Sequence, residues 1–577
     1  MRSRPTAPHR GVRSRARTLL FELRRRKVFR VLAAYAIVAL GVAEGANNVL
    51  PPLGVEWGPR VVIFLLLIGL PVTIVLAWAF DITPRGLQRT PDSVPAFPAG
   101  DRRGTSRAAA EPAAAEPLPP GSIATLPLVN LSGDPAQDYL SDGLTEELIV
   151  ALSRVPGLRV AARTSSFAMR NAASDVRTIG RSLGVRHVLE GGVRMSGNQL
   201  RLSVQLVDAE TGYAEWSETY DRQVDDLFEV QRSVAQAVVE RVSAGSREAA
   251  DAVAGPGTRN LQAYHYLLRG RHHWNRRTES ALRRAVEHFE QAIALDPAFA
   301  RAWAGLADAL SLLLDYGALP AAEALPRAIE SAEHALDLDG DLAEAWTSLA
   351  LVREFEWRWE EAEVAFRRSI QLRPDYAVAH QRFALHHAWL GRTEAAIVEA
   401  RTAERLDPLS AAVLASTGFV LYYGRHYDLA AVNANRALEL DPHFATARTA
   451  LGLARLHQGR PDEAIAALEA AAADSGRAAS TISLLACARA AAGRTGEAEA
   501  ALADLQAAAH ERHVPDYYLA LPQLALGNGD GALDALERAC AAQAPQMAYI
   551  RAEPLLDPLR GQPRFVALLE RTGLLRY

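Results

Sequence analysis

The chain has 577 residues, of which 49% are hydrophobic and 23% charged, a balance typical of folded protein with several domains. Residues 1–30 hold ten arginines and Lys27 against one acid, a net charge of +10, so the remaining chain carries about −14 of the overall −4. Lys27 is the only lysine, which excludes phosphate-loop, kinase and Schiff-base mechanisms that need a lysine further along. Cys487 and Cys540 lie too far apart in sequence to indicate a disulfide framework or a cysteine zinc site.

The sequence predicts a membrane hairpin over residues 31–80. Residues 61–80 contain no charged side chain, and a helix of that length crosses the ~30 Å hydrocarbon layer of a bilayer. Residues 31–50 are interrupted by Glu44 and two asparagines, so a cleaved or interfacial segment stays open as the alternative there.

Arginine placement predicts the orientation of this hairpin. The basic residues 1–30 precede it, Arg60 stands alone in its loop, and several arginines follow it. Both ends are therefore expected in the cytoplasm, giving a two-pass protein of the inner membrane, whereas the soluble part would be periplasmic if only one segment spans. We expect the basic segment to contact anionic lipid, and we do not expect nucleic-acid binding.

After a Pro- and Ala-rich linker over residues 81–121, an α/β domain is predicted over residues 122–245. Leu200, Leu202, Val204 and Leu206 alternate with polar residues, which indicates a strand with one buried face. We expect one covered sheet face in this domain. The predicted elements are strands at 124–131, 158–163 and on both sides of the turn "SGN", and helices ending near 155, at 178–183 and at 225–243.

The stretch "SDGLTEELIVALSR", residues 141–154, combines acids with an apolar run. Leucines recur every four residues in it, as on the buried side of an amphipathic helix. Asp142, Glu146 and Glu147 are expected in or near the first turn, with Asp142 as a cap. A hydrolase site built from these acids is the disfavoured alternative, because Glu146 and Glu147 project about 100° apart.

A second polar stretch, "RTSSF", follows the next predicted strand. Arg163, Thr164, Ser165 and Ser166 could form an anion-binding lip. The favoured interpretation is a strand-to-helix turn capped by a hydroxyl group.

The segments "LPLVNLSGD", "YLSDGLTEELIVALSRVPGLRVAARTSSF", "IGRSLGVRHVLEGGVR" and "AEWSETYDR" closely resemble the TolB-like N-terminal domain that precedes tetratricopeptide repeats in many bacterial membrane proteins. The resemblance covers about residues 122–245 and implies a regulatory or assembly module without catalysis. Relatives often carry a cyclase domain or a winged DNA-binding domain in front. Residues 1–30 are too few for either, so those activities are not carried over.

A linker over residues 246–262 leads to internal repeats over 263–545. Small residues recur every 34 positions except for one step of 43, and "LDP" or "LRP" keeps the same register, which predicts eight tetratricopeptide units. Residues 546–577 are expected to form C-terminal capping helices. The repeating small residues are Ala285, Ala328, Ala362, Ala396, Ala430, Ala464, Ala498 and Ala532.

The repeat register places several side chains towards the concave groove, where a peptide or helix of another protein would bind, although several of them could instead pack between repeats. The candidates are Asp308, Phe355, Trp389, Phe419, Tyr422 and Tyr423. Adjacent histidines in "RGRHHW" and "LHHAW" lack the i,i+4 spacing of a helical metal site, so packing or surface roles are expected.

The sequence therefore predicts a multidomain chain with two N-terminal transmembrane helices, an α/β TolB-like domain and an all-α tetratricopeptide solenoid. We expect a non-enzymatic, membrane-tethered scaffold or regulatory protein that recruits other proteins, without a cofactor or a metal. The alternative is a signalling subunit that senses a small anionic ligand through its TolB-like domain, related to the accessory regions of cyclases or membrane transcription regulators. The sequence leaves the oligomeric state open.

Overall fold

The computed structural model describes residues 80–83, 86–89, 118–170, 175–242 and 257–577, and the chain divides into two compact units, Met1–Ala113 and Ala114–Tyr577. In the first unit, strands β1 (Phe80–Thr83) and β2 (Gly86–Arg89) pair antiparallel. They lie where the sequence predicts the linker, and Phe80 is the last residue of the predicted second span. The rest of that span, residues 61–79, and the first span at 31–50 lie outside the described residues. Within the described residues, no helix is both long and apolar enough to cross a membrane.

The second unit begins with an α/β domain whose strands run in the order β5-β3-β6-β7-β8, with β4 pairing to β6. β3 is parallel to β5 and β6, whereas β6, β7 and β8 form antiparallel pairs. The strands are β3 (Ser122–Thr125), β4 (Val129–Asn130), β5 (Arg159–Val160), β6 (His187–Ser196), β7 (Gln199–Asp208) and β8 (Ala214–Gln223). The helices are η2 (Pro135–Gln137), α4 (Asp138–Ser153), α5 (Arg163–Ala168), α6 (Val176–Leu183), η3 (Val224–Asp226) and α7 (Leu227–Val242).

Three details of this domain differ from the sequence-based expectation. The strand expected at 124–131 is split into β3 and β4, because Pro127 between them has no N–H group for the ladder. β8 was not predicted, since its side chains are mostly exposed and only Tyr220 is buried. At "RTSSF" the expected helix begins, but Ala162 is the N-cap residue and no hydroxyl group caps it.

The sheet is covered on both faces only at β3 and β6, whereas β7 and β8 leave one face largely exposed, so the expectation of a single covered face holds for β7 and β8 and is wrong for β3 and β6. The predicted alternation along β7 is confirmed, and Leu200, Leu202, Val204 and Leu206 pack with residues of α4 and α7. On the other face, Val188 of β6 packs with Ile179 of α6 and with Ala124. The second layer arises because β3 and β6 are interior strands with apolar side chains on both sides.

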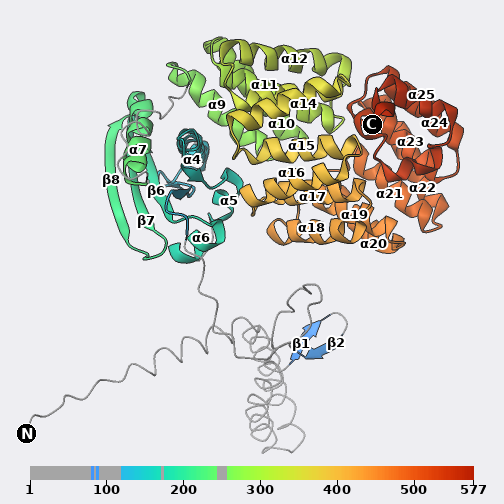
Figure 1. Ribbon diagram of the computed structural model, residues 1–577, viewed down its shortest axis with the longest axis horizontal. Helices are drawn as coiled ribbons and strands as arrows, with labels where there is room; N and C mark the ends of the chain where they lie inside the picture. The colour runs from blue at the N-terminus through green and yellow to red at the C-terminus, as the bar shows by residue number, and fades with distance from the viewer. Residues whose placement is uncertain (1–79, 84–85, 90–117, 171–174, 243–256) are drawn as a thin grey trace, which may run out of the picture. The chain divides into compact units, whose positions relative to one another are not determined.

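Residues 257–577 form a helical solenoid of the tetratricopeptide type (Figure 1). All eight repeating alanines are fully buried, so the predicted period is confirmed. The helix pairs are α9 (Leu261–Trp274) with α10 (Glu279–Leu295), α11 (Ala300–Asp315) with α12 (Ala321–Leu338), α13 (Ala343–Phe355) with α14 (Trp359–Leu372), α15 (Ala377–Trp389) with α16 (Thr393–Leu406), α17 (Ala411–Tyr423) with α18 (Tyr427–Leu440), α19 (Ala445–His457) with α20 (Pro461–Asp474), α21 (Ala479–Ala491) with α22 (Thr495–Glu511), and α23 (Asp516–Ala525) with α24 (Gly529–Ala541). The longer step of the repeat falls in the second pair, where α11 and α12 have 16 and 18 residues against 13 and 14 in the third pair.

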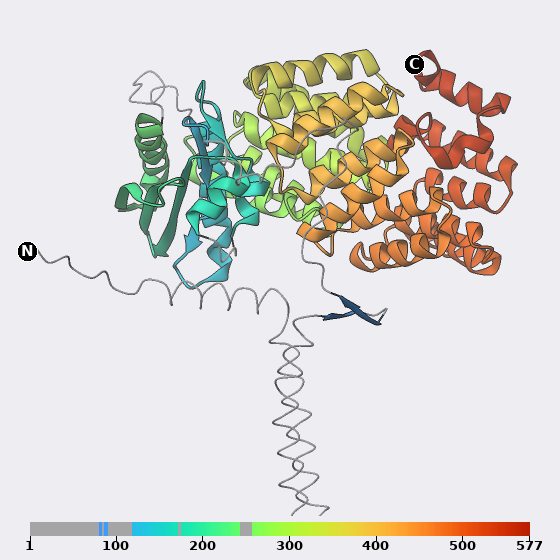
Figure 2. The ribbon, with the colours of Figure 1, turned by 60° about the horizontal axis from the view of Figure 1, so that its bottom comes forward.

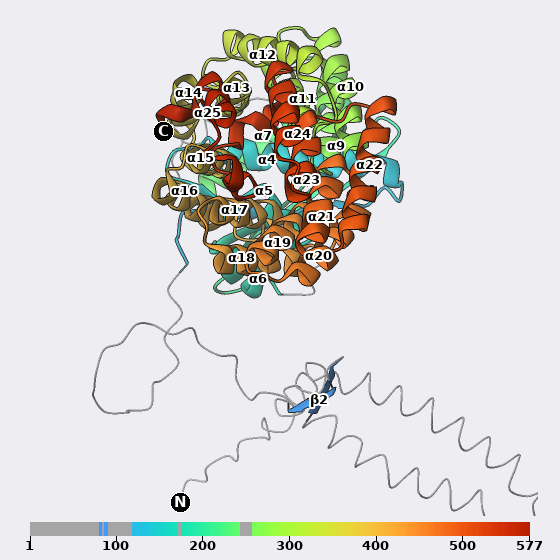
Figure 3. The ribbon, with the colours of Figure 1, turned by 90° about the vertical axis from the view of Figure 1, so that its right-hand side faces the viewer.

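The repeat helices follow one another around a ring when the array is viewed from its C-terminal side (Figure 3). The α/β domain meets the array at its other end, where α4 packs against α9 (Figure 2). This contact belongs to one continuous core that contains Leu144 of α4 and Leu268 of α9.

The C-terminal segment is η4 (Pro545–Tyr549), η5 (Pro554–Leu559), α25 (Pro563–Arg571) and η6 (Leu574–Arg576). It packs on the inner helices of the array. The Gln546 amide donates to the Asp315 carbonyl at 3.1 Å, and the Tyr422 hydroxyl donates to Glu553 Oε1 at 2.5 Å. The expected C-terminal cap is therefore largely 3-10 helix, and it lies on the inner wall as well as at the end.

Candidate functional site

The junction between the α/β domain and the array is held by the acids of α4. Glu147 is 1% exposed; its Oε2 accepts a hydrogen bond from Arg301 Nη1 at 2.6 Å, and Arg301 Nη2 donates to Oε1. Arg271 Nη1 approaches Oε1 at 3.4 Å. Burial alone would raise the pKa of Glu147, but the field and hydrogen bonds of Arg301, with Arg271, hold that pKa below its usual value. Glu147 is thus an ionised carboxylate shared by two arginines of the array.

Two further acids of α4, Glu146 and Asp142, also pair with residues outside this helix. Glu146 accepts hydrogen bonds from Arg163 of α5 and, at 3.0 Å, from the amide of Asn275. Asp142 pairs with Arg170 and lies 3.7 Å from the His272 ring nitrogen. Burial would raise the pKa of Asp142, but hydrogen bonds from His272 and Arg170 lower it.

These contacts correct the expected role of Asp142. Helix α4 begins at Asp138, five residues earlier than a helix capped by Asp142 would begin, so Asp142 lies inside the helix and does not cap it. The helical segment is entered through η2, whose N-cap Asp134 accepts from the Ala136 amide at 2.9 Å. The acids at 142, 146 and 147 are therefore junction residues and not part of the helix start.

Helix α5 makes a second link to the array. The backbone N–H and the hydroxyl of Ser165 donate to Asp407 Oδ1 at 3.0 and 2.6 Å, and the Leu409 N–H donates to the Ser165 hydroxyl at 3.0 Å. Burial raises the pKa of Asp407, although the hydrogen bonds from Ser165 and Thr164 oppose that rise. The residues of "RTSSF" thus bind carboxylates of the same chain. Ser165 and Thr164 donate hydrogen bonds to Asp407, and Arg163 donates one to Glu146. Ser166 is fully buried beside them.

A cavity of about 370 Å³ lies between α4, α5 and the inner helices of the first repeats. Its wall includes Arg163 and Thr164 of the α/β domain and many array residues. Several opposite charges in or beside the wall already pair, such as Arg373 with Glu344 at 2.5 Å. The array side contributes Arg271, Trp274, Arg277, Arg301, Asp308, Glu344, Arg373, Asp375, Tyr376 and Gln381, among others.

A second cavity of about 700 Å³ shares Ser153, Glu344, Arg373 and Asp375 with the first. Arg154 lines it, and burial together with nearby Arg301 and Arg373 lowers the pKa of Arg154, although Glu344 opposes this. Both cavities therefore place arginines at the seam between the α/β domain and the array.

Comparison with known proteins gives two partial matches, of which the first covers most of the α/β domain. The family described as HilA/YgeH-like transcriptional regulator, second domain, matches residues 121–237. A protein of Rhizobium meliloti (strain 1021) named "Putative adenylate cyclase 3" is 40% identical over 205 residues, which are 34% of this chain and 34% of that protein. The chain thus spans about a third of the curated relative it matches.

Solved structures of tetratricopeptide proteins are similar at low identity. YrrB, described as a TPR protein with an unusual peptide-binding site, is 20% identical with a TM-score of 0.23, over 33% of this chain and 94% of that chain. The Cut9–Hcn1 hetero-tetramer of the APC/C is 16% identical with a TM-score of 0.35, over 55% of this chain and 53% of that chain.

Most of the residues predicted for the concave groove are covered by the chain itself. Trp389 and Tyr423 contact the ring of Tyr549, with centroids 5.7 and 6.1 Å away. Tyr422 is fully buried, and its hydroxyl donates a hydrogen bond to Glu553. Phe355 is 1% exposed within the core, and Phe419 is partly buried beside Tyr423. Asp308 alone of the six lines the 370 Å³ cavity.

The adjacent histidines pack, as expected. His386 is fully buried and its Nδ1 lies 2.8 Å from Glu354 Oε1. Burial lowers the pKa of His386 to about 4 and raises the pKa of Glu354, so both groups are favoured in their neutral forms. His273 shows the same burial effect, with a pKa of about 4.

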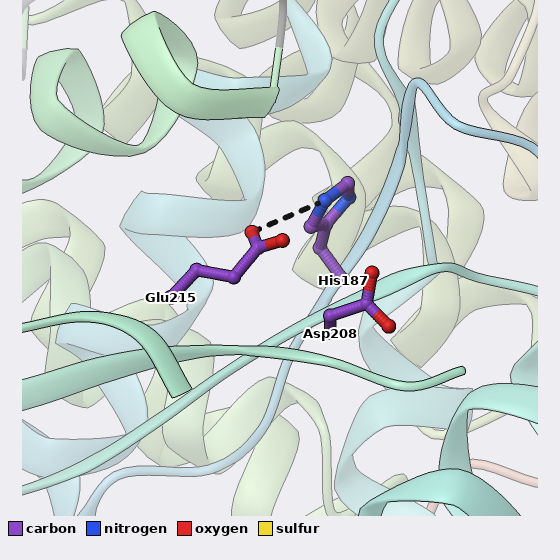
Figure 4. Close-up of side chains that lie close together, drawn as sticks. All are labelled: His187, Asp208 and Glu215. Carbon is purple, nitrogen blue, oxygen red and sulfur yellow. Dashed lines mark ion pairs between the residues drawn. The ribbon is translucent and has the colours of Figure 1, made fainter. Parts of the chain in front are cut away.

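Another histidine lies between two acids at one end of β6, β7 and β8 (Figure 4). His187, Asp208 and Glu215 are close enough to hold a cation, and His187 Nε2 lies 3.5 Å from Glu215 Oε2. However, Asp208 Oδ1 already accepts from two backbone N–H groups at 2.8 Å, and Oδ2 accepts from Arg186 at 3.0 Å. The positive charge of Arg186 beside Asp208 would repel a metal ion. We therefore interpret the cluster as polar side chains that stabilise this end of the sheet through hydrogen bonds.

Sequence reasoning missed the array residues that complete the junction, Arg271, Arg301 and Asp407. No motif marks them, because their partners lie 124, 154 and 242 residues earlier in the chain. A signal exists in the repeat register. At the position equivalent to Arg301, the next repeat has Glu344 and the later repeats have Val378, Ala412 and Thr446. A charged residue therefore occupies this position only in the repeats near the α/β domain.

Proposed function

We propose that this chain is a membrane-tethered, non-enzymatic regulatory scaffold that recruits protein partners through its repeat array. The tether is the hairpin predicted at residues 31–80, with the soluble part in the cytoplasm. The array provides a long surface of repeated helices, which suits partner recruitment. The inner wall is largely covered by the chain itself, so we assign partner binding to the outer wall.

One observation carries this assignment. Val364, Val398 and Val432 occupy the same position in three consecutive repeats, on α14, α16 and α18, and they are 65, 61 and 47% exposed. Leu429, 52% exposed, adds to this outer row. Large apolar side chains repeated at one solvent-facing position have no packing role within the array, and exposed apolar patches mark interaction sites. The row fits a partner protein whose own apolar side chains contact several successive repeats.

A photo-crosslinking amino acid at position 398 of the full chain, in intact membranes, tests this proposal. We expect a discrete adduct that is lost when Val364→Glu and Val432→Glu are added. The matched control carries the crosslinker at Glu330, which has the same repeat position on α12 and is exposed. An adduct as strong at position 330, or one that survives both glutamates, contradicts the outer-row assignment.

The second candidate function is that of a signalling subunit that senses a small anionic ligand. The observation that favours it is the arginine-lined cavity enclosed by both the α/β domain and the array, whose filling would bias the junction. The partial matches to a named putative adenylate cyclase and to a transcriptional-regulator domain agree with a regulatory role.

A further inference from the structure

Asp308 departs from the repeat pattern in a way that the fold does not require. Trp303 and Trp346 occupy equivalent positions in their two repeats, since each indole N–H donates to a backbone carbonyl six residues earlier, at 2.9 and 2.8 Å. In that register, Asp308 stands where the four following repeats have only large apolar residues. These residues are Leu351, Leu385, Phe419 and Leu453. A carboxylate at an apolar inner position opposes packing, and such violations of a local rule concentrate at functional sites.

Asp308 also lacks a counter-ion in contact. Within the described residues, no arginine or histidine nitrogen lies within 4.0 Å of its carboxylate, although Arg277, Arg382 and Arg271 are near enough to act on it electrostatically. Burial raises the pKa of Asp308, and those arginines oppose the rise. The side chain lines the 370 Å³ cavity and remains partly accessible from it.

Arg277 is the complementary group in the same cavity wall. Its guanidinium carbon lies 3.7 Å from the centre of the Trp274 ring, which holds the side chain in place. Within the described part of the chain, no carboxylate lies within 4.0 Å of it, in contrast to Arg163, Arg301 and Arg373, which each pair with a glutamate. Burial lowers the pKa of Arg277, against the opposing effects of Tyr316 and Asp308.

We propose that this cavity binds a small ligand that carries a carboxylate or phosphate oxyanion together with a hydrogen-bond donor, with Arg277 holding the oxyanion and Asp308 accepting from the donor. A guanidinium fixed on an aromatic face presents its N–H groups to an oxyanion in a set geometry. The volume of about 370 Å³ is at the lower end of the range for small-molecule sites. Arg163 and Ser165 are satisfied by Glu146 and Asp407, so the ligand is recognised from the array side of the seam. The inference rests on the second candidate function and names the chemistry of its ligand.

Calorimetric titration of the full chain in detergent tests the proposal with two matched pairs of probes. L-Glutamate and glutarate form the carboxylate pair, and glucose 6-phosphate and ethyl phosphate form the phosphate pair; only the first member of each pair adds donor groups. We expect one donor-bearing probe to bind, and the stronger pair identifies the oxyanion. Arg277→Gln should weaken that binding about ten- to hundred-fold, the loss of one charge-assisted hydrogen bond.

Asp308→Leu separates binding from folding. It restores the residue type of the later repeats, so we expect a higher melting temperature together with loss of the preference for the donor-bearing probe. Arg201→Gln is the matched control, because Arg201 is 60% exposed and lies on the sheet. No binding of any probe to the wild-type chain, or equal binding to the Arg277 and Asp308 variants, overturns the proposal. Either result leaves the crosslinking test of the outer row unaffected, so the two functions fail independently.

Discussion

The two halves of the array's inner wall are built from the same repeat but are filled in opposite ways. Beside the α/β domain, the wall carries paired charges such as Glu147 with Arg301, and a cavity of about 370 Å³ remains. Towards the C-terminus, the wall is covered by apolar and aromatic side chains of the chain's own end, including Met547 and Tyr549. Ion-paired side chains are held in place by their partners, and space remains between them. Apolar side chains pack closely against one another and leave no comparable space. The chemistry of the covering segment, and not the repeat, therefore decides whether the groove stays open.

The largest effect is expected from breaking the charged half. Glu147→Gln leaves Arg301 buried and Arg271 half-buried without their carboxylate, and we expect the free energy of unfolding to fall by about 3–5 kcal/mol. Chemical denaturation of the full chain measures this. The double variant Glu147→Met with Arg301→Met should recover much of the loss.

The exposed pair between Arg201 and Asp221 is the control for that experiment, since both side chains are 60% exposed. Asp221→Asn should leave the denaturation midpoint unchanged. If Glu147→Gln also leaves it unchanged, the junction is not held by this ion pair.

The apolar half is tested by Met547→Ala. Met547 is fully buried, so its truncation creates a cavity, and we expect a loss of about 2–5 kcal/mol in the same assay. Leu575→Ala, at a residue 46% exposed in the same segment, should have little effect. A loss as small for Met547 as for Leu575 would mean that the C-terminal segment does not pack on the wall.

A smaller effect is expected at the α5 link. Ser165→Ala removes a donor from the buried Asp407 and an acceptor from the Leu409 amide, and we expect a loss of about 1–3 kcal/mol. Ser182→Ala is the matched control, because that exposed hydroxyl bonds only within α6. Equal behaviour of the two variants would show that the link at Asp407 contributes nothing to stability.

Glu147 in the charged half and Glu553 in the apolar half should contribute to the pH dependence of stability with opposite sign. The folded pKa of Glu147 is lowered, so its stabilisation is present above the ordinary value of 4.5 and is lost as pH falls through the folded pKa. Burial raises the folded pKa of Glu553, so its contribution is present below 4.5 and is lost as pH rises through the folded pKa. Stability curves of Glu147→Gln and Glu553→Gln between pH 3 and 8 measure both slopes. Glu147→Gln should flatten the loss of stability on the acid side, and Glu553→Gln should flatten the loss of stability as pH rises above 4.5. The same change of slope in both variants would contradict this assignment.

The repeats could be predicted from sequence because their packing is local. A small residue such as Ala362 is needed wherever two helices cross, so the period appears directly in the chain. The alternation of β7 was visible for the same reason. The edge strand β8 was not, since its side chains mostly face solvent and carry no period. The acids of α4 were misassigned because a carboxylate near a helix start usually serves the helix itself.

The site could be predicted only in fragments. Asp308 was found through its register, and Arg163 to Ser166 through their oxyanion-binding chemistry, although in the structure they meet carboxylates of the chain itself. The junction depends on pairs such as Ser165 with Asp407, separated by 242 residues, for which a single sequence gives no pairing signal.

The separation of Glu147 from its partner also sets an order of events during synthesis. Arg301 lies 154 residues after Glu147, so at about 5–20 residues per second the ribosome delivers it roughly 8–30 s later. Until the array is made, beginning with Arg271 at 124 residues after Glu147, the Glu147 carboxylate has no arginine of the array to pair with. A newly made chain therefore passes through an interval in which its α/β domain exposes the Glu147 carboxylate that the finished protein buries, while Asp142 and Glu146 can already pair with arginines of that domain.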